Sequence, residues 1–205
     1  MAYLIYIAVA IFSYLIGSIS PSIIISNRFQ KRDIRNYGSG NAGSTNMIRT
    51  FGWGIGLLTF ALDIFKGALV VYIATVVGNL INDNFGICYM IASFSVIAGH
   101  SWPIYYKFKG GKGVATTLGI LLVLMPLPTL GCLAIAIGTI VISGIVSIGS
   151  ILGVILCSIS TFIFYDNTAL SITICTLSAF IIFLHRQNII RLLKGTENKL
   201  SFKKK

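Results

Sequence analysis

The chain has 205 residues, of which 56% are hydrophobic and only 10% are charged. Soluble domains carry about 25% charged residues, so this balance excludes a soluble globular protein and indicates an all-α integral membrane protein. The net charge of +11 comes from basic residues gathered in a few segments rather than along one stripe, so no nucleic-acid partner is expected. We predict one polytopic domain over residues 1–205, embedded in a lipid bilayer.

Neither a cleavable leader nor a metal centre is expected. Residues 1–26 lack the basic start and the small-residue cleavage site of a signal peptide, so the first apolar stretch is expected to remain as a span. The cysteines form no Cys-x-x-Cys or Cys/His cluster, so no metal, cofactor or disulfide framework is predicted. Each stands alone in apolar sequence: Cys88, Cys132, Cys157 and Cys175.

The apolar stretches predict the membrane spans, each of which needs about 20 residues. The first, Tyr3–Ile25, contains Gly17–Ser22, which we expect to kink or open the helix near its end. Residues 114–143 are interrupted by Met125–Pro128 and form either two short tilted helices or a re-entrant hairpin. The other predicted spans are Trp53–Asn79, Phe85 to about Tyr105, Ser150–Tyr165 and Ala169–Leu184.

The distribution of basic residues predicts the topology. Of the 16 Lys and Arg residues, 15 lie in residues 28–49, 107–112, 186–194 and 199–205. The positive-inside rule places these segments and the C-terminus in the cytoplasm and the N-terminus outside. That arrangement needs an odd number of spans, so we interpret residues 114–143 as two helices, which gives about seven transmembrane helices. Five spans with a re-entrant pair is the alternative.

One basic residue, Lys66, lies inside a predicted span. Asp63 precedes it by three residues, which places both side chains on one face of a helix. Charges within a span are costly and usually paired. The pair is therefore either a mutual ion pair near the membrane interface or part of a polar cavity that Lys66 lines.

The segment Gly99–Thr117 carries the chemistry of an anion site. Its turn Gly110-Gly111-Lys112-Gly113 lets the backbone approach a ligand closely, its amides can point at an anion, and Lys109 and Lys112 add charge. It is not a Walker loop, because no Ser or Thr follows Lys112. The alternative is a basic loop that only fixes membrane orientation.

A second Gly-rich loop, Tyr37–Arg49, precedes the second span. Its glycines permit tight turns, its hydroxyl and amide side chains donate hydrogen bonds, and Arg49 can bind phosphate through two parallel bonds. Two such loops on one side of the membrane predict a ligand with two phosphate groups or two phosphorylated ligands. The polar candidates in this loop are Ser39, Asn41, Ser44, Thr45 and Asn46.

Side chains for acid–base catalysis are scarce. The five carboxylates all lie outside the Gly-rich loops, and no Gly-x-Ser-x-Gly elbow exists. His100 is followed five residues later by Tyr105, so the His/Asp dyad common in acyl-CoA-dependent acyltransferases is absent. His100 is a general base, a ligand contact or a helix-end residue. Two later segments could add donors: residues 143–150, and 185–197, in which His185 and Asn188 lie one helical turn apart.

At these residues the sequence resembles the bacterial acyl-phosphate:glycerol-3-phosphate acyltransferases, the PlsY family. The matching stretches follow the family's order and cover nearly the whole chain. Ser44 stands where the family usually has Ala, and residues 143–145 lack the aromatic or basic residue of many members. The matching stretches are residues 38–46, Gly99-His100 with Pro103, residues 108–116, residues 146–150 and residues 185–197.

The resemblance implies transfer of a fatty acyl group from acyl phosphate to the 1-hydroxyl of glycerol 3-phosphate, the first acylation in bacterial phospholipid synthesis. It implies a multi-pass protein of the bacterial cell membrane with a cytoplasmic active site, and it allows for contact with the enzyme that generates the acyl phosphate. We expect electrostatic catalysis by Ser39, Arg49, Lys112 and loop amides. The resemblance adds His185 to the catalytic set and implies a substrate-binding set of Asn41, Thr45, Asn46, His100, Lys109, Gly110, Gly111, Thr116, Ser147 and Asn188.

Two rival functions follow from the same features. A transporter of an organophosphate anion would suit the basic loops and Lys66, but no inverted repeat is visible and the charge lies on one side of the membrane. An acyl-CoA-dependent enzyme is disfavoured by the missing His/Asp dyad.

Overall fold

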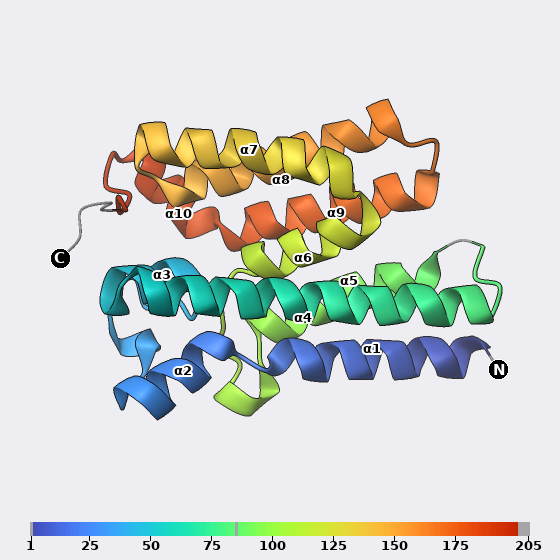
Figure 1. Cartoon of the computed structure of the whole chain (residues 1–205), viewed down its shortest axis with the longest axis horizontal. Coiled ribbons are helices and arrows are strands. Elements are labelled where there is room, and N and C mark those ends of the chain that lie inside the picture. The colour runs from blue at the N-terminus through green and yellow to red at the C-terminus, as the bar shows by residue number, and fades with distance from the viewer. Residues whose placement is uncertain (1, 85, 201–205) are drawn as a thin grey trace. The chain divides into compact units, whose positions relative to one another are not determined.

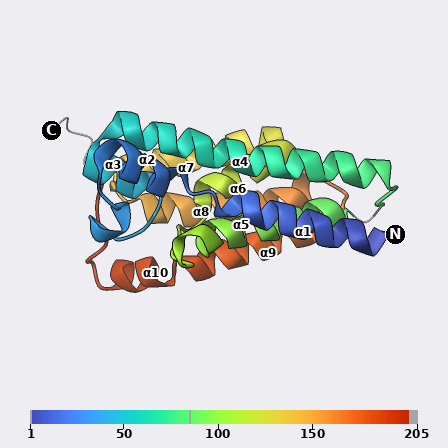
Figure 2. The ribbon, with the colours of Figure 1, turned by 90° about the horizontal axis from the view of Figure 1, so that it is seen from below.

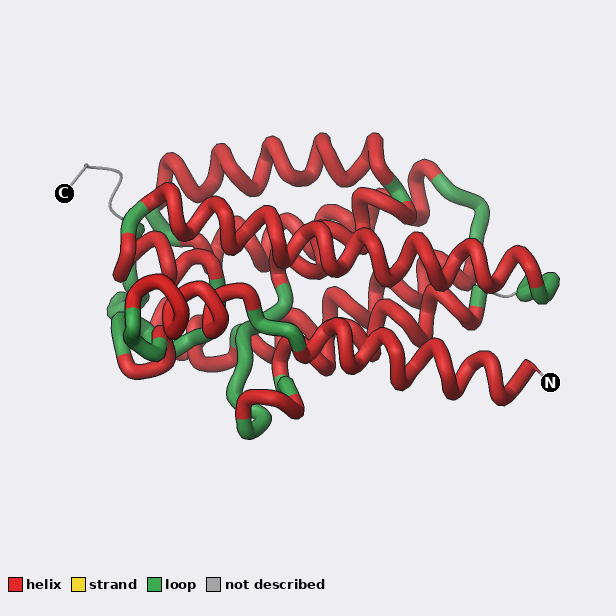
Figure 3. The backbone as a smooth tube through the Cα atoms, turned by 60° about the horizontal axis from the view of Figure 1, so that its bottom comes forward, coloured by secondary structure: helices red, strands yellow, loops and turns green. Residues whose placement is uncertain are grey.

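In the computed structural model of the chain, residues 2–84 and 86–200 are described, and all of their regular structure is helical (Figure 3). The chain forms two compact units, Met1–Val123 and Leu124–Lys205. Phe85, where the third span was predicted to begin, and the terminal lysines Lys203–Lys205 lie outside the described residues.

The first unit opens on a broken helix. Two residues separate α1 (Ala2–Ser18) from α2 (Pro21–Gln30). This break confirms the predicted interruption near Gly17–Ser22. The cause is Pro21, which lacks an N–H and is accommodated at the first position of the new helix. The rest of the unit consists of η1 (Ile34–Asn36), α3 (Ser44–Phe51), α4 (Trp53–Leu80), α5 (Ile87–Ser101), η2 (Ile104–Tyr106) and α6 (Val114–Leu124).

Close helix contacts hold this unit together. α5 packs against α1 and α4, and glycines permit the approach. A Cβ on Gly17 would overlap the carbonyl of Val96, and one on Gly99 would overlap the carbonyl of Tyr14. α2 and α3 lie at the end of the unit opposite the N-terminus (Figures 1 and 2). There a small buried core fixes the first Gly-rich loop: Ile23, Ile25, Ile34, Ala42 and Met47.

The second unit is a set of antiparallel neighbours. α8 (Val146–Phe164) packs against α7 (Pro126–Ser143) and α9 (Thr168–Leu184), and α10 (Arg186–Leu193) continues α9 after a bend of 59°. The chain then returns to the α7–α8 turn, where the amide of Leu200 donates to the carbonyl of Gly144 at 2.7 Å. This return places residues after α10 beside the start of α8.

Five helical segments are long and apolar enough to cross a membrane, and the bent α9–α10 pair makes six. Residues 114–143 form two helices, as both interpretations of that segment require. α6 has eleven residues and is shorter than the other candidates. The described residues thus form an all-helical protein with five or six candidate spans, while the seventh crossing stays a prediction.

Candidate functional site

The first Gly-rich loop is built around the side chain of Asn46, which is 1% exposed. Its Oδ1 accepts a hydrogen bond from the amide of Ser39 at 2.9 Å, and its Nδ2 donates to the carbonyls of Tyr37 and Asn41 at 2.9 and 3.1 Å. Gly38, with φ of 57°, is required here because a Cβ would overlap Oδ1 of Asn46. The structure therefore directs Asn46 into its own loop, which it shapes.

The anion-binding candidates of this loop flank the start of α3. Gly43 precedes the helix without a side-chain cap, and Ser44 and Thr45 form its first turn. Arg49 follows one turn after Thr45 on the same helix and is half-buried. Ser39 lies on the exposed surface of the loop. The helix N-terminus, the hydroxyls and the guanidinium thus belong to one short segment, as an anion site requires.

The second Gly-rich loop lies on the end of α5. The amides of Gly110 and Gly111 donate to the carbonyls of Ser101 and His100, each at 3.1 Å. A Cβ on Gly110 would overlap the His100 carbonyl, so the glycine is needed for this approach. Lys112 follows directly, and α6 begins two residues later at Val114. The predicted turn into an apolar helix is confirmed.

The two Gly-rich loops contact each other. The amide of Ala42 lies 3.4 Å from the carbonyl of Gly110. Arg35 donates from Nη1 to the carbonyl of Tyr106 at 2.8 Å and pairs with Asp33 at 2.7 Å. The hydrogen bond from Arg35 holds the pKa of Asp33 below its usual value. Sequence reasoning brought both loops to one side of the membrane but missed Arg35, which joins them.

His100 and Thr116 lie behind this junction. Thr116 Oγ1 is 3.3 Å from Nδ1 of His100, and both residues are buried. Lys66 and Asp63 form the predicted ion pair at 2.9 Å, and Lys66 also lies 2.9 Å from Nδ1 of His100. The ion pair is therefore confirmed, and it extends to a predicted site residue.

Two predicted site residues of the second unit, Ser147 and Asn188, donate hydrogen bonds to the carboxylate of Glu197. Its Oε1 accepts from Ser147 at 3.1 Å and from Asn188 at 2.6 Å, and its Oε2 accepts from Arg191 at 2.7 Å. Burial raises the pKa of Glu197, but the hydrogen bonds from Asn188, Arg191 and Ser147 outweigh burial and leave the pKa below its ordinary value. Sequence reasoning missed Glu197 as an organising residue, although it is the only glutamate in the chain.

His185 joins α9 to α10 and is 3% exposed. Its Nδ1 lies 2.8 Å from the carbonyl of Ile181, an acceptor, so Nδ1 carries a proton. In the neutral ring Nε2 then carries the lone pair. Asn188 follows one turn later and is also buried, so the predicted pairing of His185 and Asn188 on one helix end is consistent with the bend after α9.

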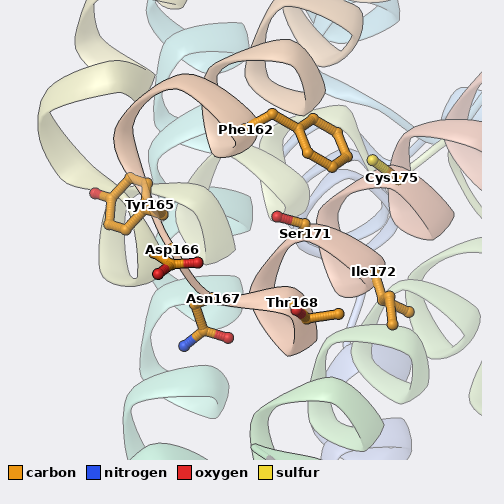
Figure 4. Close-up of a pocket in the computed structure, with 8 residues that line it drawn as sticks. All are labelled: Phe162, Tyr165, Asp166, Asn167, Thr168, Ser171, Ile172 and Cys175. Atoms are coloured by element: carbon orange, nitrogen blue, oxygen red, sulfur yellow. The ribbon is translucent and has the colours of Figure 1, made fainter.

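A pocket of about 340 Å³ lies at the α8–α9 turn, at the opposite end of α9 from His185 (Figure 4). Asn167 caps α9 there by accepting from the amide of Leu170. The pocket contains none of the predicted site residues. Its lining consists of Phe162, Tyr165, Asp166, Asn167, Thr168, Ser171, Ile172 and Cys175.

Comparison with known proteins identifies the family. The family model described as glycerol-3-phosphate acyltransferase matches residues 7–195. The glycerol-3-phosphate acyltransferase of Thermoanaerobacter pseudethanolicus is 44% identical over 194 residues, covering 95% of each chain. That of Clostridioides difficile is 44% identical over 199 residues, covering 97% of each chain.

Solved structures agree with the sequence relatives. The crystal structure of PlsY, an integral membrane glycerol 3-phosphate acyltransferase, in its glycerol 3-phosphate form is 34% identical with a TM-score of 0.86 and covers 96% of each chain. The lysophosphatidic acid form is 33% identical with a TM-score of 0.84, covering 96% of this chain and 95% of that one. The resemblance drawn from the Gly-rich loops is confirmed: this chain is a multi-pass membrane protein and belongs to the glycerol-3-phosphate acyltransferase family.

Proposed function

We propose that the chain transfers a fatty acyl group from acyl phosphate to the 1-hydroxyl of glycerol 3-phosphate, giving lysophosphatidate and phosphate. The observation that carries the proposal is the junction of two basic, Gly-rich loops, joined by Ala42 and Gly110 and by Arg35. Both substrates are phosphorylated, which suits two anion-binding loops. The related PlsY structures with glycerol 3-phosphate and with lysophosphatidic acid support the acceptor and the product.

The chemistry rests on electrostatics. The hydroxyl oxygen of glycerol 3-phosphate attacks the acyl carbonyl carbon, and the bond from that carbon to the phosphate oxygen breaks. Arg49, Lys112, the Ser39 hydroxyl and the loop amides stabilise the charge that develops on the carbonyl and on the departing phosphate. Phosphate is a good leaving group, and a substrate phosphate oxygen takes the proton of the hydroxyl. Asn41, Thr45 and Lys109 would bind substrate in the same unit. The amides of Gly110 and Gly111 instead donate to the carbonyls of Ser101 and His100, so these glycines shape the loop.

Ser147, His185 and Asn188 are the proposed polar contacts of the second unit. Glu197 holds Ser147 and Asn188 through one carboxylate oxygen. The ring of His185, held at Nδ1 by the Ile181 carbonyl, is proposed to contact a substrate hydroxyl. These contacts orient substrate and add no charge of their own.

The positive-inside rule supports a cytoplasmic active site. We infer an outside N-terminus, a cytoplasmic C-terminus and seven crossings in which α6 is the fourth. Both Gly-rich loops then face the cytoplasm, where soluble glycerol 3-phosphate and an enzyme that generates acyl phosphate would reach them. The inner membrane of a bacterial cell is the corresponding location.

An acyl-transfer assay tests the reaction. Detergent-purified protein receives radiolabelled glycerol 3-phosphate with palmitoyl phosphate in one tube and palmitoyl-CoA in another. We expect organic-soluble label with palmitoyl phosphate alone. Label with palmitoyl-CoA would favour the acyl-CoA-dependent class, and no label from folded protein would favour anion transport.

Charge variants connect the reaction to the loops. Arg49→Ala and Lys112→Ala should each lower kcat/KM by about a hundredfold or more, because each removes a charged donor from developing negative charge. Lys107→Asn is the matched control, since Lys107 is exposed and has φ of 56°, which asparagine tolerates. Equal activity of Lys107→Asn and Lys112→Ala would contradict the assignment of Lys112.

A further inference from the structure

Lys66 is an ammonium group buried on a membrane-spanning helix. Its side chain is 7% exposed and that of Asp63 is 2% exposed. An ion pair alone would leave two ammonium hydrogens without acceptors at a place where desolvated charge is costly. The structure supplies acceptors from outside α4: the carbonyls of Gly17 and Ile19 at 3.2 and 2.9 Å, and Nδ1 of His100 at 2.9 Å.

The two carbonyl contacts bind Lys66 to the break between α1 and α2. Carbonyl groups at a helix end lack partners within the helix and need them inside a membrane. A cation there also interacts favourably with the helix dipole. The helix break therefore accounts for a buried lysine, but it does not account for the contact with His100.

The contact between Lys66 and His100 decides which ring nitrogen of His100 carries the proton. An ammonium group only donates, so Nδ1 at 2.9 Å presents its lone pair. A neutral imidazole with its lone pair on Nδ1 carries its hydrogen on Nε2. Oδ1 of Asp63 lies 2.9 Å from the ammonium and 3.3 Å from Nδ1, and it accepts a hydrogen bond from neither group. The carboxylate therefore interacts with Lys66 as an ion pair and does not compete for the lone pair of Nδ1.

Nε2 of His100 faces the junction of the Gly-rich loops. A Cβ on Gly111 would overlap Nε2 and would lie 2.7 Å from the carbonyl oxygen of Ala42. Within residues 2–84 and 86–200, the hydrogen bonds of the His100 ring all involve Nδ1. The Nε2 hydrogen thus meets the two loops at the place where Lys112 follows Gly111.

We propose that Asp63 and Lys66 are positioning residues that hold His100 as the neutral Nε2–H tautomer, and that Nε2–H donates a hydrogen bond to the phosphate group of a substrate at the loop junction. This assignment rests on the proposed acyl transfer and adds a donor to it. The pair in α4 thereby serves substrate binding as well as the helix break.

The tautomer is read directly by NMR without turnover. Long-range ¹⁵N–¹H spectra of protein labelled with ¹⁵N-histidine report which ring nitrogen is protonated, and a His185→Gln sample assigns the His100 signals. We expect protonated Nε2 in the unmodified protein, a loss of this preference in Lys66→Met, and a shift of the Nε2 signal on addition of glycerol 3-phosphate or of inorganic phosphate. Protonated Nδ1 in the unmodified protein, or an Nε2 signal that neither anion moves, would overturn the proposal.

Kinetics separate the positioning role from a structural one. His100→Gln places an amide donor near the Nε2 position, whereas the shorter His100→Asn ends near Nδ1. We expect His100→Asn to raise KM for one phosphorylated substrate about tenfold, with His100→Gln within about threefold of the unmodified protein, because a hydrogen bond to a charged group is lost only in the first. Equal KM values for the two variants would overturn the proposal.

A double variant that removes both members of the ion pair controls for misfolding caused by a single unpaired buried charge. Asp63→Asn/Lys66→Met removes both buried charges together, and it should fold and show the same rise in KM as His100→Asn. Thr75→Val is the control on α4, since among the described residues its hydroxyl bonds the Val71 carbonyl of its own helix and no other group. A double variant with an unchanged KM contradicts the positioning role. If the unmodified protein transfers no acyl group, the proposed function fails, and the NMR spectra still decide the tautomer.

Discussion

Asn46 uses its whole amide group to hold its own loop. Asn46→Ala removes the acceptor for the Ser39 amide and the donor for the carbonyls of Tyr37 and Asn41. We expect a loss of about 3 kcal/mol in the free energy of unfolding, because buried backbone groups are left without partners. Thermal unfolding in detergent measures it. The exposed neighbour Asn36 is the control, and Asn36→Ala should change the free energy by less than about 0.5 kcal/mol.

This residue shows where sequence reasoning stops. The Gly-rich pattern around Asn46 predicted a polar loop correctly, since glycines and donors are local features. It did not predict that the asparagine points inward, because that depends on Gly38 leaving room and on four backbone groups meeting around the amide. An Asn46→Ala protein as stable as the unmodified chain would show that the amide faces a ligand instead.

Glu197 gives the second unit a pH dependence. Its pKa is lower in the folded chain than its ordinary value of 4.5, so its contribution to stability is fully present above about pH 4.5. As pH falls through the lower folded pKa the carboxylate is protonated and the contribution is lost. We therefore expect Glu197→Gln to lower the free energy of unfolding by about 2 kcal/mol at neutral pH, with the difference shrinking below pH 4.

Unfolding curves of both proteins between pH 3 and pH 7 check this. Asp33, whose pKa is also lowered, is present in both proteins, so its contribution cancels in the difference. A difference that stays constant with pH would contradict the assignment. Activity of Glu197→Gln should fall as well, because the carboxylate holds Ser147 and Asn188.

At the level of elements, glycines set how closely helices approach. A Cβ on Gly119 of α6 would overlap the carbonyl of Ile64, and one on Gly67 of α4 would overlap the carbonyl of Thr116. Gly119→Ala therefore forces the helices apart and should cost about 1–3 kcal/mol. In α7, Gly131 has nothing within 4 Å of the added Cβ, so Gly131→Ala should leave thermal stability unchanged or raise it.

Parallel unfolding scans compare the two variants. A loss of stability in Gly131→Ala equal to that in Gly119→Ala would show that the cost does not come from the contact between α6 and α4. The comparison is matched, because both substitutions add one methyl group within an apolar helix.

The elements that sequence predicted are those with long apolar runs or a proline. The break before Pro21 and the interruption at Met125–Pro128 both follow from proline, which acts locally. The short elements η1 and α3 were not predicted, because helices of eight residues or fewer depend on tertiary contacts more than on propensity. The Asp33–Arg35 pair and the 59° bend after α9 were not predicted either, since both depend on tertiary contacts.

At the scale of the whole molecule, charge asymmetry is the strongest evidence for orientation. The basic segments alternate along the chain with the neutral or acidic turns at residues 82–84 and 166–167. That alternation is kept whether α6 crosses the bilayer or re-enters on the cytoplasmic side. α6 is about 16 Å long at 1.5 Å per residue, against a hydrocarbon core of about 30 Å. A crossing at α6 therefore requires the adjoining Gly-rich loop to lie below the membrane surface, where irregular backbone must be covered by protein or line a water-filled cavity.

Cysteine labelling distinguishes these topologies. In a background in which the four native cysteines are replaced and acyltransferase activity is retained, single cysteines at Asn82, Leu127, Asp166, Lys107 and Lys194 are treated with an impermeant maleimide. We expect the reagent to label Asn82→Cys and Asp166→Cys in intact cells and to label Lys107→Cys and Lys194→Cys only after permeabilisation. Leu127, which is 80% exposed and follows α6, decides the number of crossings. Labelling of Leu127→Cys from outside supports seven spans, whereas labelling only after permeabilisation means that residues 114–143 re-enter and five spans remain.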